Sequence, residues 1–194
     1  MFSIFLKNKH EVEYKGEILE YNDSFDTILK VFLLSKDKEA TDVDKITISI
    51  SLLFGEEIAK SLPIEKQFEL YCLVAEDLNG SKEQGHSELL TDIEGNVIPV
   101  ELIAEEEHER LVSFTQDSEE IFSSFLQQYG IDLIEQQGKL SYCKFIALLR
   151  NIGEDTPLGK LEKIRSYKPD TETKNYDLEM KKLQSIVAIR NDEL

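Results

Sequence analysis

The sequence of 194 residues has few of the residue types that build reactive sites. It has no tryptophan, two cysteines, three histidines, four prolines and nine glycines. Two cysteines exclude a disulfide-rich fold. No histidine lies at metal-ligand spacing from another histidine or from a cysteine, so we expect no zinc site. The glycines fall mostly at turns and helix ends, and none forms a phosphate-binding loop. We therefore expect no catalytic residues, no metal and no cofactor, and hence no enzyme.

The chain also has little positive charge and no long apolar run. It has 22 basic and 39 acidic residues, which gives a net charge of −17. Nucleic acid is not an expected partner, because phosphate contacts need a positive surface. No apolar run approaches the roughly 20 residues that span a bilayer. Residues 1–6 are apolar but too short for a signal-peptide core, so we expect a cytoplasmic protein without a membrane segment.

What the sequence does have is helical spacing, which is clearest from residue 117 onward. We expect Asp117 to cap a helix whose Glu120 completes a capping box, and Gly130 to end it. Further helices are predicted over 140–152, from Thr156-Pro157 to the break at Pro169, and over 170–190. Their expected apolar faces are Ile121, Phe122, Phe125, Leu126 and Tyr129; Tyr142, Phe145, Ile146, Leu149 and Ile152; Leu158, Leu161 and Ile164; and Tyr176, Met180, Leu183 and Val187.

The N-terminal part predicts a β-hairpin followed by helices. Strands are expected over 11–14 and 17–21 around Lys15-Gly16, with Ile18 opposite Val12 and Tyr14. Asn22 or Asp23 should cap a helix with the stripe Phe25, Ile28, Leu29, Phe32 and Leu33. Another helix should restart at 61–63 and run to Leu78, with Ile64, Phe68, Tyr71, Cys72, Ala75 and Leu78 on one face.

Residues 44–54 fit two patterns. Isoleucines alternate there as in a strand, yet Ile46, Ile50, Leu53 and Phe54 also lie at helical spacing, with Asp42 as a cap. We choose a helix that ends at Gly55. Residues 80–116 then form an acidic connector or insertion, with a small second hairpin predicted around Glu94-Gly95-Asn96. The fold class is thus mainly α, a helical domain over 1–194 with a short N-terminal β-hairpin.

The C-terminal half carries a family resemblance. Its runs are YGIDL, KF-x-ALLR, EDT-x-LGK, RSY and MKKL, at residues 129–133, 144–150, 154–160, 165–167 and 180–183. Together they resemble the bacteriophage gene-product-fifteen family of tailed phages and prophages. The match is weaker from Glu11 to Asn79 and slight from Gly80 to Arg110. This chain departs from the family at Cys143, where an aromatic is usual, and at Asn151-Ile152, where Gly-Leu is usual.

The resemblance implies a role in phage tail morphogenesis, with no catalytic residues to carry over. The leading hypothesis is a tail assembly chaperone that binds the tape-measure protein, the tail-tube protein or both, in the cytoplasm of the bacterial host. One alternative is a virion structural component, for head–tail joining or tail completion, which requires self-association. Another is an acidic protein that mimics DNA and inhibits a host DNA-binding enzyme.

Candidate partner contacts lie in a basic stretch of the same half. Residues 139–168 contain seven basic and three acidic residues, so their net charge is +4 while the remainder of the chain carries −21. This stretch either pairs with the protein's own acidic surface or docks an acidic partner. Arginine and tyrosine are favoured at interface anchors, although the same types also serve cores. We therefore select Tyr142, Arg150, Arg165 and Tyr167 as candidate partner-binding residues.

Overall fold

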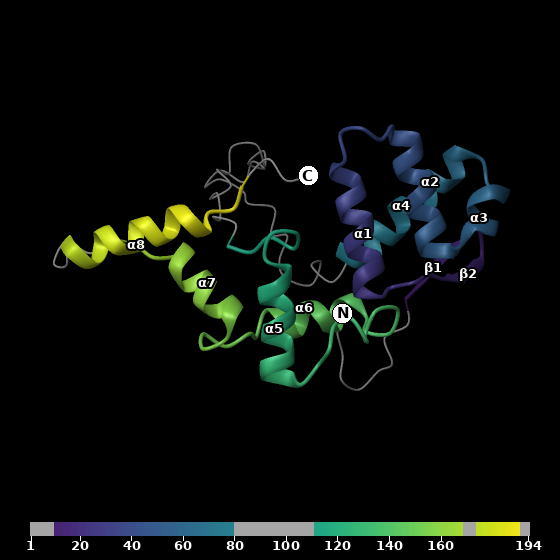
Figure 1. Cartoon of the computed structure of the whole chain (residues 1–194). Coiled ribbons are helices and arrows are strands. Elements are labelled where there is room, and N and C mark those ends of the chain that lie inside the picture. Colours follow the sequence, from purple (N-terminus) through teal and green to yellow (C-terminus); the bar gives the residue numbers. More distant parts are fainter. Residues whose placement is uncertain (1–9, 80–110, 169–173, 191–194) are drawn as a thin grey trace, which may run out of the picture. The chain divides into compact units, whose positions relative to one another are not determined.

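A computed structural model describes residues 10–79, 111–168 and 174–190 (Figure 1). The chain forms two compact units, unit 1 at Met1–His108 and unit 2 at Glu109–Leu194. The described residues contain eight helices and one antiparallel hairpin, which confirms the mainly α fold with an N-terminal hairpin. The single domain over 1–194 stays a prediction. The second hairpin and the acidic run predicted within the connector lie outside the described residues.

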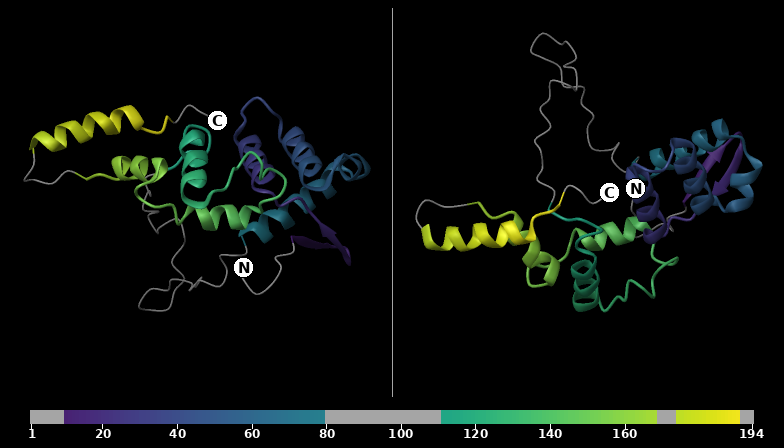
Figure 2. Two further views of the ribbon diagram at one scale, coloured as in Figure 1. Left: turned by 60° about the horizontal axis from the view of Figure 1, so that its bottom comes forward. Right: turned by 45° about the horizontal axis from the view of Figure 1, so that its top comes forward.

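Unit 1 begins with the predicted hairpin of β1 (Glu11–Tyr14) and β2 (Glu17–Glu20). Lys15 has φ 54° and Gly16 has φ 84°, and a two-residue type I′ turn requires positive φ at both positions. Glycine adopts such angles at no steric cost, so it suits the second position. The hairpin contacts helix α4, and Figure 2 shows it alongside the helices of unit 1.

The strand register corrects one prediction for the hairpin. Val12 pairs with Leu19 and is 5% exposed, whereas Ile18 pairs with Glu13 and is 68% exposed. The two-residue turn fixes this register, and directly paired residues share a face of the sheet. The expectation that Ile18 lies opposite Val12 and Tyr14 is therefore wrong, because Leu19 occupies that place.

Helix α1 spans Phe25–Lys36, and its start differs from the prediction. Ser24 occupies the N-cap position, but its hydroxyl donates to the Thr27 hydroxyl at 2.9 Å and caps no backbone N–H of the helix. The Asn22 side chain instead accepts a hydrogen bond from the Ser24 backbone N–H at 3.1 Å, which makes a local turn before the helix. The prediction of Asn22 or Asp23 as the cap is therefore wrong by one or two positions.

Helix α2 spans Asp42–Phe54, so the helical interpretation of this ambiguous segment is confirmed. The cap is Thr41 rather than Asp42, because the Thr41 hydroxyl accepts from the Asp44 N–H at 3.2 Å and donates to the Asp44 carboxylate at 2.6 Å. The first bond satisfies a backbone N–H that the helix start leaves open, and the second joins the two side chains. Gly55 ends the helix with φ 93°, as predicted.

Two helices complete unit 1, the short α3 (Glu56–Ser61), which was not predicted, and α4 (Ile64–Asn79). The Gln67 side chain joins them, because its amide donates to the Ala59 carbonyl at 2.7 Å and to the Leu62 carbonyl at 2.9 Å. These bonds satisfy carbonyls that the end of α3 leaves without helical partners.

The core of unit 1 is apolar. Ile28 of α1, Ile50 of α2 and Leu70 of α4 are all 0% exposed. The buried face of α4 consists of Gln67, Leu70 and Val74, and Phe68 is 52% exposed. The face predicted for this helix, centred on Phe68, is therefore wrong, because the helix turns a neighbouring face to the core.

Unit 2 begins with α5 (Ser118–Tyr129), whose end and N-cap position were predicted but whose predicted capping bonds are absent. Gly130 is left-handed, with φ 65°, and its N–H donates to the Leu126 carbonyl at 3.1 Å. Asp117 occupies the N-cap position, but its side chain caps no N–H of the helix, so the predicted capping box with Glu120 is wrong. The carboxylate is engaged by an arginine instead.

Helix α6 (Tyr142–Leu149) is shorter than the predicted 140–152. Its Phe145 ring stacks on Phe125 of α5, with centroids 5.2 Å apart and both side chains at most 1% exposed. Such offset aromatic pairs add to the free energy of apolar burial. This pair forms the centre of the core of unit 2.

Helices α7 (Pro157–Arg165) and α8 (Lys174–Val187) complete unit 2 and contact each other. The Thr156 hydroxyl caps α7 by accepting from the Gly159 N–H at 3.2 Å, as predicted for a Thr-Pro start. The core of unit 2 extends to Leu158, which is 0% exposed and whose N–H donates to the buried Ser124 hydroxyl at 2.9 Å.

Candidate functional site

Arg165, at the end of α7, joins three other segments of unit 2. Its Nη1 and Nη2 donate to the two carboxylate oxygens of Asp117 at 2.6 and 2.7 Å. Nη1 also donates to the Leu111 carbonyl, and Nε to the Val187 carbonyl, both at 2.7 Å. The Arg165 and Asp117 side chains are 6% and 2% exposed. One buried guanidinium therefore connects residue 111, the start of α5, the end of α7 and the end of α8.

The Asp117 carboxylate is fully engaged within unit 2. In addition to the two arginine bonds, it accepts from the Ser113 N–H at 2.7 Å. Burial of two charges costs several kcal/mol per ion, and the cost is recovered only when geometry and hydrogen bonding are good. The two parallel bonds to Arg165 and the third donor meet this condition. Loss of either side chain would leave its partner as an uncompensated buried charge.

Glu162 lies beside this ion pair, and both charges of the pair affect the pKa of its carboxyl group. Burial raises the pKa of the Glu162 carboxyl, Arg165 opposes the rise, and the Asp117 charge adds to it. Desolvation and a neighbouring like charge both favour the neutral form of a carboxyl group. The Glu162 carboxyl thus binds a proton at a higher pH than an ordinary glutamate does.

Tyr167 and the backbone around it fasten α8. The Tyr167 hydroxyl donates to the Asp177 carboxylate at 2.5 Å, and its ring meets Tyr176 edge-on with centroids 5.7 Å apart. The Gln184 amide donates to the Tyr167 carbonyl at 2.8 Å and to the Arg165 carbonyl at 3.3 Å. Arg165, the last residue of α7, and Tyr167, two positions later, were both predicted as partner contacts, and both hold α8 in place.

Gln116 joins the segment before α5 to the segment after α8. Its amide Nε2 donates to the Ala188 carbonyl at 3.1 Å, and its Oε1 accepts from the Arg190 N–H at 3.1 Å. The segment before α5 and the segment after α8 thus lie side by side, as the two carbonyl contacts of Arg165 also require.

The other two candidate residues lie at opposite ends of α6. Tyr142 is its first residue and is half-buried, and burial raises the pKa of its hydroxyl, with Cys143 adding to the rise and Arg150 opposing it. Arg150 is the C-cap residue of α6 and is exposed. The structure therefore brings Arg165 and Tyr167 together at the joint of α7 and α8 and leaves Tyr142 and Arg150 apart from them on α6.

Helix α8 carries a set of exposed apolar side chains that sequence reasoning assigned in part to the core. Met180 is buried at 8% exposure, but the other large apolar residues are not. The exposed set is Tyr176 at 54%, Leu178 at 57%, Leu183 at 42% and Ile186 at 74%. These four residues lie along one helix of 14 residues and give it a large exposed apolar surface, and large apolar surfaces mark binding sites more often than scattered single residues do.

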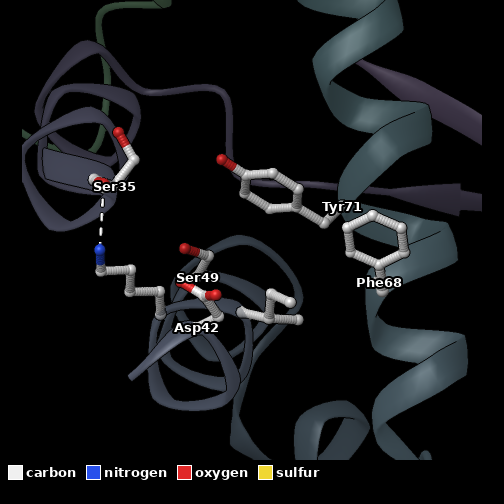
Figure 3. A pocket seen from close by; sticks show the side chains of 7 residues that line it. Ser35, Asp42, Ser49, Phe68 and Tyr71 are labelled. Carbon is white, nitrogen blue, oxygen red and sulfur yellow. Dashed lines mark hydrogen bonds between the residues drawn. The ribbon is translucent and has the colours of Figure 1, made fainter. Parts of the chain in front are cut away.

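Unit 1 has a hollow of ≈ 270 Å³ between α1, α2 and α4 (Figure 3). It is lined by Ser35, Asp42, Lys45, Ile46, Ser49, Phe68 and Tyr71. In Figure 3 the Tyr71 ring reaches from α4 toward the side where Ser35 lies, and Phe68 stands beside it on the same helix. The sequence analysis grouped Phe68 and Tyr71 on one apolar helix face and did not predict this hollow.

The described residues show neither a metal cluster nor a membrane span. Among residues 10–79, 111–168 and 174–190, no group of three or more His, Cys, Asp or Glu side chains is arranged to hold a metal ion. No helix within those same ranges is long and apolar enough to cross a membrane.

The comparison with protein families decides the identity. A family model described as Bacteriophage Gp15 protein matches residues 6–189, which is nearly the whole chain. The chain belongs to the Bacteriophage Gp15 protein family. It is therefore a phage-related protein, and the resemblance noted in the C-terminal half extends over unit 1 as well. No curated protein and no solved structure gave a match to this Gp15 protein.

The runs that carry the Gp15 resemblance build the fold of unit 2. In YGIDL, the Tyr129 hydroxyl donates to the Leu148 carbonyl at 2.9 Å and Asp132 accepts from the Ile134 N–H at 2.8 Å. In EDT-x-LGK, Thr156 caps α7, and in RSY, Arg165 forms the buried ion pair. The most recognisable residues of this chain thus supply a cap, hydrogen bonds and an ion pair that join the segments of unit 2.

Proposed function

We propose that this Gp15 protein is a non-enzymatic tail assembly chaperone, which binds apolar helical segments of the tape-measure protein and keeps them in solution. The observation that carries the proposal is the surface of α8, where Tyr176, Leu178, Leu183 and Ile186 are between 42% and 74% exposed. A long amphipathic helix that has no assembled partner aggregates unless its apolar face is covered. An exposed apolar helix on a soluble carrier can provide that cover.

The contacts around Arg165 support a binding role for α8, because they give it a rigid base. Arg165 donates to the Val187 carbonyl at the end of α8, and Tyr167 donates to Asp177 in the first turn of α8. The Gln184 amide of α8 donates to the carbonyls of Arg165 and Tyr167. Binding to a preorganised surface costs less conformational entropy than binding that must first order the helix. We therefore assign Arg165 and Tyr167 to the positioning of α8.

Tyr142 and Arg150 are the proposed direct contacts among the four candidate residues. Arg150 is exposed at the end of α6, and Tyr142 keeps part of its surface open at the start of the same helix. Arginine donates several hydrogen bonds from one planar group, and tyrosine combines an apolar ring with a polar tip. This pair suits the polar edge of an amphipathic partner.

Co-expression of the full chain with the tape-measure protein of the same phage or prophage tests the proposal. We expect more soluble tape-measure protein and a complex that co-purifies. Ile186→Ser should weaken the complex, and Ile18→Ser is the matched control, because Ile18 is 68% exposed on the hairpin. Unchanged solubility and no complex with the unaltered chain would remove the chaperone role.

Mass spectrometry of purified particles separates the chaperone from a virion component. A chaperone leaves before assembly is complete, so we expect no peptides of this chain in the particles. Peptides at a fixed ratio to the tail-tube protein would replace the proposal with the structural role.

A further inference from the structure

Helix α4 has more apolar surface than unit 1 covers. Leu70 and Val74 are 0% and 2% exposed and form the core face. The neighbouring face carries Phe68, which is 52% exposed, and the half-buried Tyr71 and Cys72. A half-exposed phenylalanine forgoes part of the free energy that full burial would provide. Burial of this uncovered face by a partner would therefore be favourable.

The hollow opens beside this face, and its size limits the occupant. Its volume of ≈ 270 Å³ is below the range of about 300–1,000 Å³ that is usual for sites of small ligands and cofactors. Phe68, Tyr71 and Ile46 supply most of its apolar lining. A hollow of this size admits one or two apolar side chains that project from a partner helix.

The edges of the hollow carry negative charge. Lys45 is engaged, because its Nζ donates to the Ser35 carbonyl at 3.2 Å, whereas Asp42 lies exposed at the start of α2 (Figure 3). Along α4, Glu65, Glu69 and Glu76 are exposed and follow one another at helical spacing, next to the face of Phe68. Residues 10–79 together contain 16 acidic and 7 basic residues. A basic partner is favoured on this side.

We infer that the hollow and the exposed face of α4 are a docking surface for an amphipathic helix of another phage protein, whose apolar face is flanked by lysine or arginine. An apolar side chain of this helix enters the hollow against Phe68, and its basic residues meet the row of glutamates. Helix-in-groove recognition uses anchors at this spacing, and complementary charge selects the partner. The inference deepens the proposed function and rests on it for the nature of the partner.

Synthetic helical peptides provide the probe. Two peptides of about 20 residues, long enough to hold a helix, carry the same leucine stripe and one tryptophan, with lysines flanking the stripe in one and glutamates in the other. The chain has no tryptophan, so the fluorescence of the peptide reports binding to the full-length protein without background.

We expect the lysine-flanked peptide to bind at least about tenfold tighter than the glutamate-flanked one at low salt, and salt to reduce the difference. Phe68→Glu should reduce the affinity for the lysine-flanked peptide by about tenfold or more. Ile18→Ser, which alters an exposed side chain of the hairpin, is the matched control and should leave its affinity unchanged. Circular dichroism confirms that Phe68→Glu folds, and Phe68→Ser gives a second variant without added charge.

Equal binding of the two peptides, or equal affinity of the Phe68 variants and the unaltered chain, would overturn the inference. A photo-crosslinker at residue 68 of the full chain in phage-producing cells gives an independent result. A cross-link to a basic amphipathic segment of the tape-measure protein supports the inference. If the co-expressed complex forms but only Ile186→Ser weakens it, this docking surface is wrong while the chaperone role stands.

Discussion

Unit 1 and unit 2 are of similar size, but their cores are built from different residues. The side chains most completely buried in unit 1 are Ile28, Ile50 and Leu70. In unit 2 the corresponding set includes Asp117 and Ser124 beside the aromatic stack, and both polar groups bond segments that are distant in sequence. Unit 1 buries mainly apolar side chains together with the Gln67 amide, whereas unit 2 adds a buried ion pair and a hydroxyl that join segments distant in sequence.

The difference explains why unit 2 is easier to recognise in the sequence. Apolar cores tolerate substitution by residues of similar volume, so they leave only a periodic pattern. A buried ion pair, a cap and a close backbone approach require particular residue types. Arg165, Thr156 and Gly159 all fall within the runs that resemble the family.

The largest expected effect tests the buried network of unit 2. Asp117→Ala should lower the free energy of unfolding by about 3–5 kcal/mol, because it leaves Arg165 as an unpaired buried charge. Hydrogen exchange followed by mass spectrometry should show faster exchange in peptides of α5 and α7. Lys163→Ala is the control, since Lys163 is 70% exposed in its ion pair with Glu154, and it should cost less than about 1 kcal/mol. Similar losses in the two variants would contradict this account.

The second prediction tests the apolar core of unit 1. Leu70→Ala should cost about 2–5 kcal/mol, because the fully buried side chain leaves a cavity. Leu70→Met keeps the volume and should cost less than about 1.5 kcal/mol, measured by urea unfolding. A matching pair in unit 2, Arg165→Lys and Arg165→Ala, should show no such tolerance, because lysine cannot form the two parallel bonds. Tolerance of Arg165→Lys would erase the contrast between the units.

The third prediction concerns the close approach at Gly159. A Cβ atom there would lie 2.7 Å from the Glu154 Cα and 2.9 Å from the Gly153 carbonyl carbon, and would also overlap the Gly153 oxygen. Because backbone atoms cannot swing away, Gly159→Ala should destabilise unit 2 by about 1–3 kcal/mol. Lys160→Ala, at the exposed next position, should have little effect in the same unfolding assay. Wild-type stability of Gly159→Ala would show that α7 shifts freely.

The smallest expected effect is a pH dependence that arises in unit 2. The pKa of Glu162 is raised above its ordinary 4.5. Its contribution to stability is therefore complete below that value and is lost as pH rises through the raised pKa. Glu162→Gln should gain stability relative to the unaltered chain as pH increases from about 4 to 7. A constant difference between the two proteins across this range would contradict the raised pKa.

Local signals in the sequence predicted much of the fold. Gly55, Gly130 and Thr156 mark helix ends as expected, because each has a conformation or a hydrogen bond that few residues supply. The face of a helix was less predictable. On α4, Phe68 and Leu70 are both apolar, and only the packing of three helices decides which is buried.

The candidate site was predictable in its residue types and not in its geometry. Arg165 was selected as a surface contact, yet its partner Asp117 lies 48 positions earlier and had been assigned to a cap. No spacing rule links two such residues, because the pair exists only once α5 and α7 pack. The hollow of unit 1 was equally hidden, although the wide apolar stripe of α4 was a signal that one face would remain uncovered.

The two carbonyls that Arg165 binds with Nη1 and Nε belong to Leu111 and Val187, and Gln116 bonds Ala188 in the same place. The polypeptide therefore enters and leaves the C-terminal unit at one spot. A module with adjoining ends can be grafted into a loop of a host protein, or rejoined in a permuted order, with a short splice.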